Sequence, residues 1–83
     1  MSEQKKEDVF LDLSGVLCPM NFVKTKLQLE EMDEGQVLKV IIDDGEPVRN
    51  VPRSVKAEGH NILELEEIPD GHYSLLIEKV GDD

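Results

Sequence analysis

One stretch of the sequence sets where the first strand ends and the first helix begins: Leu13-Ser14-Gly15-Val16-Leu17-Cys18-Pro19-Met20-Asn21. Pro19 suits the first turn of a helix, where backbone N–H groups have no partner within the helix, so Cys18 is predicted at or beside the N-cap position. A sulfur at that position faces the positive end of the helix dipole and several free N–H donors, and both favour the thiolate. The stretch therefore predicts an activated cysteine at the start of a helix.

Cys18 is the only cysteine in the chain. A redox dithiol of the Cys-x-x-Cys type needs a second cysteine to resolve the mixed disulfide, and Asn21 occupies that position. Intramolecular disulfide chemistry is therefore excluded. The remaining roles for one thiolate are nucleophilic attack, carriage of a sulfur atom as a persulfide, an intermolecular disulfide, or inert burial.

Hydrophobic periodicity predicts six elements around this stretch. Strands are expected at 9–13, 37–42, 61–67 and 72–80, and helices at 19–32 and from about 46 to 58. The helix between the first two strands implies that they are parallel, with a right-handed crossover. The turn at residues 68–71 implies an antiparallel hairpin for the last two strands. The order β-α-β-α-β-β predicts an α/β two-layer sandwich, a four-stranded mixed sheet with both helices on one face.

The spacing of apolar residues predicts the faces of these elements. Pro52 lies inside the second helix, so we expect a kink there or a helix that begins only near that residue. The predicted apolar sets are Val9, Leu11 and Leu13 in the first strand, Met20, Val23 and Leu27 in the first helix, Val48, Val51 and Val55 in the second helix, and Leu63 and Leu65 in the third strand.

Length and composition fit one small domain. The 83 residues are 39% hydrophobic without tryptophan, enough for one modest aliphatic core. We expect a single domain at residues 9–80, a disordered N-terminal tail at 1–8 and a C-terminal tail at 81–83. No apolar stretch has the length of a membrane span and the chain starts with polar residues, so a cytoplasmic protein is expected, in agreement with a lone cysteine in a reducing compartment.

The formal net charge is −10, from 19 acidic and 9 basic residues. This charge disfavours direct binding to nucleic acid or to an anionic membrane. The acidic excess fits a solvated exterior, and it can also steer docking onto a basic partner surface.

Four motifs are spaced along the chain: Asp12-x-x-Gly15-x-x-Cys18-Pro19 followed by a helix, Asp43-Asp44-Gly45-Glu46-Pro47, Val51-Pro52 and Gly59-His60. Together they resemble the TusA family of small sulfurtransferases, also called SirA-like, over about residues 9–80. The resemblance implies a sulfur relay, in which the single cysteine accepts a sulfane sulfur from a cysteine desulfurase or rhodanese-like donor and passes it to an acceptor protein. The family motif is usually Cys-Pro-x-Pro with an arginine before the glycine, whereas this chain has Asn21 and Ser14 at those positions.

The residues around Cys18 are candidates for shaping the site. Gly15 and Pro19 suit a tight turn and a helix start, respectively, and Asn21 replaces the second proline of the motif. Asp12 is either an exposed strand carboxylate or a cap that ties down the loop before the cysteine.

The two histidines, His60 and His72, each sit beside a glycine at a strand start, which favours ordinary loop histidines. Together with Cys18 they lack the close spacing of zinc ligands, so we expect neither a metal nor a cofactor. The spacing also supports no Cys-His or Ser-His-Asp nucleophile arrangement. Persulfide transfer does not strictly need one, because its leaving group is itself a thiolate.

Other residues are candidates for partner binding. Arg49, Arg53 and Lys56 recur at helical spacing, either as a solvated face or as a stripe that borders the cysteine and meets an acidic partner. Lys24 is likewise either part of a solvated face or a contact for a partner. Met20 and Phe22 are either core residues or an apolar collar around the sulfur.

The function expected from the sequence is that of a sulfurtransferase-type persulfide carrier that uses Cys18 and is monomeric between encounters with its partners. The alternative is a regulatory or protein-binding module in which the cysteine is structural and the acidic surface contacts the partner. Rapid alkylation of the thiol well below pH ~8.5, the ordinary pKa of cysteine, distinguishes the carrier from the binding module.

Overall fold

The computed structural model describes residues 7–17 and 20–81. Within them the chain forms β1 (Val9–Asp12), α1 (Met20–Glu30), β2 (Val37–Asp43), α2 (Glu46–Ala57), β3 (Asn61–Glu67) and β4 (His72–Glu78). This succession confirms the predicted β-α-β-α-β-β order.

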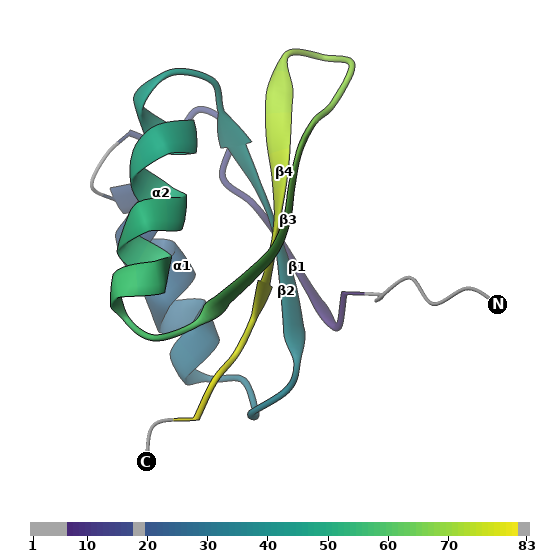
Figure 1. Ribbon diagram of the computed structural model, residues 1–83. Coiled ribbons are helices and arrows are strands. Elements are labelled where there is room, and N and C mark those ends of the chain that lie inside the picture. The colour runs from purple at the N-terminus through teal and green to yellow at the C-terminus, as the bar shows by residue number, and fades with distance from the viewer. Residues whose placement is uncertain (1–6, 18–19, 82–83) are drawn as a thin grey trace, which may run out of the picture.

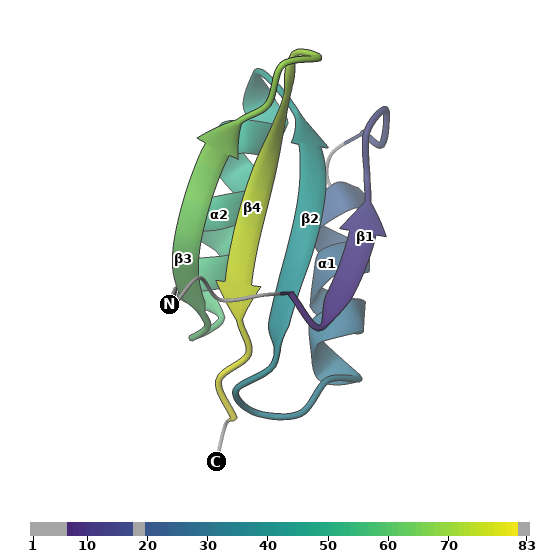
Figure 2. The same cartoon turned by 90° about the vertical axis from the view of Figure 1, so that its right-hand side faces the viewer.

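The strands form one mixed sheet in the order β1-β2-β4-β3. β1 is parallel to β2, whereas β4 is antiparallel to both of its neighbours, β2 and β3. Both helices cover the same face of this sheet, as Figures 1 and 2 show. The two-layer architecture, the parallel pair and the final hairpin were therefore predicted correctly. Because β4 is the antiparallel neighbour of β2, the last residue of β2 lies beside the first residue of β4. These strand ends form one edge of the sheet, across the strand direction.

The core lies between the sheet and the helices. On β1, Val9 and Leu11 pack against the core while Phe10 is exposed, and Leu13 is buried just after the strand, as predicted. The central strands supply most of the fully buried side chains, which is expected of strands with a neighbour on each side. From β2 these are Val37, Leu38, Val40 and Ile42, and from β4 they are Leu75 and Ile77.

The buried face of α1 differs from the predicted one. The prediction grouped Met20, Val23 and Leu27, but Met20 is 49% exposed and Leu27 is 55% exposed. These apolar residues do share one side of the helix, since they are three and four residues apart, but that side faces largely outward.

The inward stripe of α1 is partly polar, which is why hydrophobic periodicity missed it. Its buried members are Asn21, Thr25 and Leu29, spaced four residues apart. Thr25 Oγ1 donates a hydrogen bond of 2.8 Å to the Asn21 carbonyl, so the hydroxyl is satisfied within the helix. A polar pair can therefore occupy the buried side of this helix.

α2 presents the predicted face to the core. Val51 and Val55 are fully buried and Val48 packs against the same cluster. The helix begins at Glu46 and runs through Pro52, so of the two expected alternatives the late start near the proline was wrong. Pro52 cannot donate to the Val48 carbonyl, but the burial of Val51 and Val55 on either side of it holds the helix against the sheet.

β3 contains a β-bulge at Leu63, so strict alternation of side chains does not hold along the whole strand. Ile62 opposes Ile77 and Leu65 opposes Leu75, while the register shifts between Ile62 and Glu64. Ile77 and Leu75 are two residues apart and share a face, so Ile62 and Leu65 share it as well. The extra residue interrupts the alternation that the prediction assumed.

Candidate functional site

Several segments of the chain meet at one edge of the sheet. β1 and β2 both end there because they are parallel, and the chain then enters α1 and α2. β4 starts there, and His72 directly opposes Asp43 of β2. The segment 13–17, named here the cysteine loop because it leads into Cys18, lies at this edge. Cys18 and Pro19 themselves lie outside the described residues.

Apolar side chains anchor the cysteine loop to the core. Leu13 is buried and its N–H donates to the Ile41 carbonyl at 2.9 Å. Val16 packs against the core and donates to the Leu13 carbonyl at 3.1 Å. Leu17, by contrast, is 78% exposed. The side chain of the last described residue before Cys18 is therefore open to solvent.

Two aspartates hold the polar backbone of the cysteine loop. Asp12 accepts hydrogen bonds from the Ser14 N–H at 3.0 Å and from the Ser14 hydroxyl at 2.8 Å. Asp12 is thus an exposed carboxylate at the end of its strand and also a cap for this loop. Asp43 accepts the Gly15 N–H with both carboxylate oxygens, at 3.1 and 3.0 Å. Gly15 has a φ of 80°, a conformation that glycine adopts without a steric penalty.

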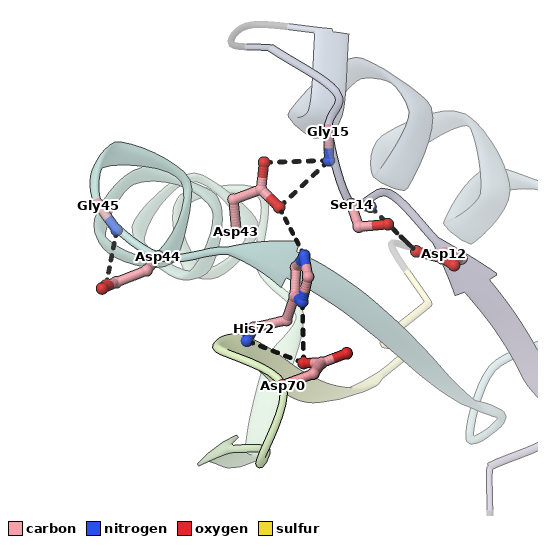
Figure 3. A network of polar contacts seen from close by, with 8 residues as sticks. All are labelled: Asp12, Ser14, Gly15, Asp43, Asp44, Gly45, Asp70 and His72. Atoms are coloured by element: carbon pink, nitrogen blue, oxygen red, sulfur yellow. Dashed lines mark hydrogen bonds and ion pairs between the residues drawn. The ribbon is translucent and has the colours of Figure 1, made fainter.

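His72 connects Asp43 to a third carboxylate. Its Nε2 lies 3.2 Å from Asp43 Oδ1, and its Nδ1 lies 2.8 Å from Asp70 Oδ1. Asp70 also accepts the backbone N–H of His72, at 3.1 Å. Figure 3 shows Asp43 between Gly15 and the imidazole, with Asp70 on the other side of the ring. A continuous chain of contacts therefore runs from the cysteine loop through β2 and β4 to the β3–β4 turn.

The charged groups of this network stabilise one another's ionised forms. The hydrogen bond to Asp70 raises the pKa of His72 above its ordinary value, and the charges of Asp70, Asp43 and Asp12 add to that effect. The same ring, together with the His72 N–H, lowers the pKa of Asp70. The Ser14 N–H and hydroxyl lower the pKa of Asp12. The arrangement favours an imidazolium among three carboxylates.

Sequence reasoning missed this network. His72 was interpreted as a loop histidine, and Asp43 was identified only as part of the motif from Asp43 to Pro47. The parallel pairing of β1 with β2 was a usable signal, since it places Asp43 beside the end of β1. The position of β4 between β2 and β3 is what brings His72 to Asp43, and no local pattern in the sequence encodes that order.

Asn21 is fully buried in the first turn of α1. Its N–H donates to the Leu17 carbonyl at 3.1 Å, a contact that the proline usual in the family motif cannot make. Its side-chain oxygen accepts the Phe22 N–H at 2.6 Å. Among the residues that the structure describes, its Nδ2 has no hydrogen-bond partner. Asn21 thus supplies the first turn with a backbone hydrogen bond in place of a rigid ring.

Met20 and Phe22 take opposite positions on α1. Met20 is exposed, whereas Phe22 packs against the core. Lys24 is exposed, as is Leu27 further along the helix. The apolar surface beside the cysteine loop therefore comes from Met20 and Leu17, and Phe22 has a structural role.

The basic residues of α2 are exposed but spread along the helix. Arg49 lies in the first turn, at the edge that carries the cysteine loop, whereas Arg53 and Lys56 follow one and two turns later. A separation of seven residues amounts to roughly 10 Å along a helix. Lys26 of α1 also forms an ion pair of 3.8 Å with Glu58, the residue that follows α2. Of the predicted stripe, Arg49 alone is close to this edge.

Across residues 7–17 and 20–81, no group of three His, Cys, Asp or Glu side chains is arranged to hold a metal ion. Neither helix in that part of the chain is long and apolar enough to cross a membrane.

Comparison with known proteins identifies the family. Residues 9–79 match the family model described as sulfurtransferase TusA. A candidate sulfur carrier protein of Archaeoglobus fulgidus is 47% identical over 78 residues, which cover 94% of this chain and 89% of that protein. The sulfur carrier protein TusA of Allochromatium vinosum is 36% identical over 72 residues, covering 87% and 93% of the two chains.

The fold has a counterpart among solved structures. The crystal structure of the SirA-like protein of Desulfitobacterium hafniense superimposes with a TM-score of 0.77 at 23% identity, over 88% of this chain and 99% of that one. The shared fold, the match along nearly the whole domain and the sequence identity to the curated relatives agree, and the chain belongs to the TusA sulfurtransferase family.

Proposed function

We propose that this protein carries a sulfane sulfur as a persulfide on Cys18, between a donor sulfurtransferase or desulfurase and an acceptor protein. Membership of a family whose relatives are named sulfur carrier proteins is the observation that carries the proposal. The described residues nearest to Cys18 in the sequence support it, because Leu17 and Met20, the first residue of α1, are both exposed.

The transfer needs no external redox cofactor. The Cys18 thiolate attacks the terminal sulfur of the donor's persulfide, the S–S bond of the donor breaks, and the donor leaves as a thiolate. A nucleophile of the acceptor then attacks the terminal sulfur on Cys18, and Cys18 leaves as a thiolate. The N-terminal end of α1 favours that anion, as the positive end of a helix dipole does.

The exposed apolar residues beside the cysteine loop are proposed as the docking surface for both partners. They are Leu17 and Met20, and the proposed surface continues along α1 to Lys24 and Leu27, which are also exposed. Apolar side chains clustered at the centre of an interface contribute most of the binding energy, while the surrounding charges set orientation. Arg49 at the same edge is proposed as a further contact.

Intact-mass analysis tests the carrier function. The protein is incubated with a cysteine desulfurase and cysteine, and separately with a rhodanese and thiosulfate, beside a Cys18→Ala control. The expected result is an added sulfur on the wild type alone that a reductant removes. If neither donor adds sulfur and Cys18 is alkylated slowly at every pH, the protein is instead a binding module with a structural cysteine.

A matched pair of variants tests the docking surface. Met20→Asp introduces a charge beside the cysteine loop and is expected to slow sulfur loading by about tenfold, as the loss of one central contact does. Phe10→Asp introduces the same charge at a similarly exposed site on the opposite face of the sheet, and it is expected to load like the wild type. Equal loading by the two variants would remove Met20 from the docking surface.

A further inference from the structure

His72 faces two carboxylates with its two ring nitrogens. Nδ1 lies 2.8 Å from Asp70 and Nε2 lies 3.2 Å from Asp43. An imidazolium has an N–H for each, whereas a neutral imidazole has only one. In the neutral ring, one nitrogen lone pair therefore faces a carboxylate, which is repulsive.

The two contacts are unequal, and this decides which one is lost on deprotonation. Asp70 is the closer carboxylate and is also fixed by the backbone N–H of His72. The neutral ring is therefore expected to keep its proton on Nδ1, which leaves Nε2 as an acceptor opposite Asp43. Deprotonation of His72 releases Asp43 rather than Asp70.

Asp43 in turn holds the cysteine loop, because both its oxygens accept the Gly15 N–H. Gly15 lies three residues before Cys18. Building on the proposed carrier function, we propose that His72 is a positioning residue, which in its protonated form fixes the cysteine loop through Asp43 and in its neutral form releases it. Three carboxylates face the ring from β1, β2 and the β3–β4 turn, namely Asp12, Asp43 and Asp70.

NMR titration of the whole chain tests the link directly. Between about pH 5 and about pH 9, carboxylates are already ionised and histidines titrate. The Gly15 amide signal is expected to move with the same midpoint as the His72 ring signals. After division by the intrinsic exchange rate at each pH, hydrogen exchange at the Gly15 amide is expected to accelerate about twofold to fivefold through that midpoint, as the loss of an exposed charged contact allows.

Three variants separate this role from a general structural one. In His72→Gln the side chain cannot change charge, so the titration of Gly15 should disappear. In Asp70→Asn the ring loses its closest anion, so the His72 and Gly15 midpoints should shift to lower pH together. His60→Gln removes a histidine at the opposite end of the sheet and should leave both midpoints unchanged.

The reactivity of Cys18 provides the functional readout. The ratio of alkylation rates between wild type and His72→Gln is expected to change about twofold to fivefold across the His72 midpoint. The inference is overturned if Gly15 does not follow His72, or if it titrates equally in His72→Gln. This outcome is distinct from failure of the carrier function, since sulfur loading is measured by mass without reference to His72.

Discussion

Gly15 combines two requirements at a single position of the cysteine loop. Its φ of 80° is costly for any residue with a Cβ, and its N–H must point at the Asp43 carboxylate. A Cβ built on Gly15 has no atom within 4 Å, so the cost of substitution lies in the backbone and not in a collision.

Gly15→Ala is expected to lower the free energy of unfolding by about 1–2 kcal/mol, the cost of a left-handed conformation for an L-residue. It is also expected to slow sulfur loading of Cys18, because the strained loop moves away from Asp43. Gly35→Ala is the matched control, since Gly35 has a φ of 91° and equally open surroundings in the α1–β2 connection. Urea denaturation should show a similar loss for both variants, and loading should be slowed in Gly15→Ala alone.

The pH dependence of stability follows from the raised pKa of His72. The folded state binds the proton more tightly than the unfolded state, so the stabilisation is complete below the ordinary histidine value of about 6.5. It is lost as the pH rises through the raised pKa. We expect urea midpoints of the wild type to fall across this range, and those of His72→Gln to stay level. A level wild-type profile would contradict the raised pKa.

The lowered pKa values of Asp12 and Asp70 act at the acidic end. A depressed carboxylate pKa stabilises the fold above its unfolded value near 3.8, and this contribution is lost as the pH falls through the folded value. The network therefore stabilises the cysteine loop most between the ordinary pKa of aspartate, 3.8, and the ordinary pKa of histidine, about 6.5.

The two sides of α1 differ in what they contribute to stability. Leu29 is 1% exposed within the core, while Leu27, two residues earlier, is 55% exposed. Leu29→Ala is expected to cost about 2–5 kcal/mol, as is usual for a buried leucine. Leu27→Ala is expected to change the free energy of unfolding by no more than about 0.5 kcal/mol. Thermal and urea unfolding of the two variants measure the difference, and comparable losses would mean that Leu27 is part of the core.

The elements and their order could be predicted from the sequence because each has a clear local pattern. The faces of β1 and α2 were predicted correctly, since apolar residues alone line their buried sides. α1 was predicted with the wrong face because Asn21 and Thr25 occupy part of the buried stripe. The bulge at Leu63 in β3 was not predicted, because it depends on pairing with β4 and not on β3 itself.

The sequence names a centre for the candidate site, which stays a prediction, but it does not give the residues that surround it. Cys18 is evident from its uniqueness and its position before Pro19. The contact of Asp12 with Ser14 is local, and it was one of the alternatives considered. The contacts of Asp43 with Gly15 and with His72 join residues 28 and 29 positions apart, so they depend on the strand order of the folded sheet.

The net charge of −10 makes the folded chain sensitive to salt. Self-repulsion among carboxylates opposes the compact state, and salt screens it. Raising NaCl to about 0.5 M, where the Debye length is well below 10 Å, is expected to raise the thermal midpoint. Glu64→Gln with Glu66→Gln on β3 is expected to raise the midpoint slightly at low salt, within about 0.5 kcal/mol per site, and to reduce the effect of salt. A midpoint that falls with salt would show that attractive pairs outweigh the repulsion.

The bulge at Leu63 also affects how this sheet meets other chains. β3 forms one lateral edge of the sheet, and an edge strand offers unpaired backbone groups to which a foreign strand can add. The bulge twists that edge, and Glu64, Glu66 and Glu67 place negative charge along it. Both features discourage strand addition and the aggregation that begins with it. On this side of the sheet, another chain therefore meets negative charge and an irregular backbone instead of a flat strand.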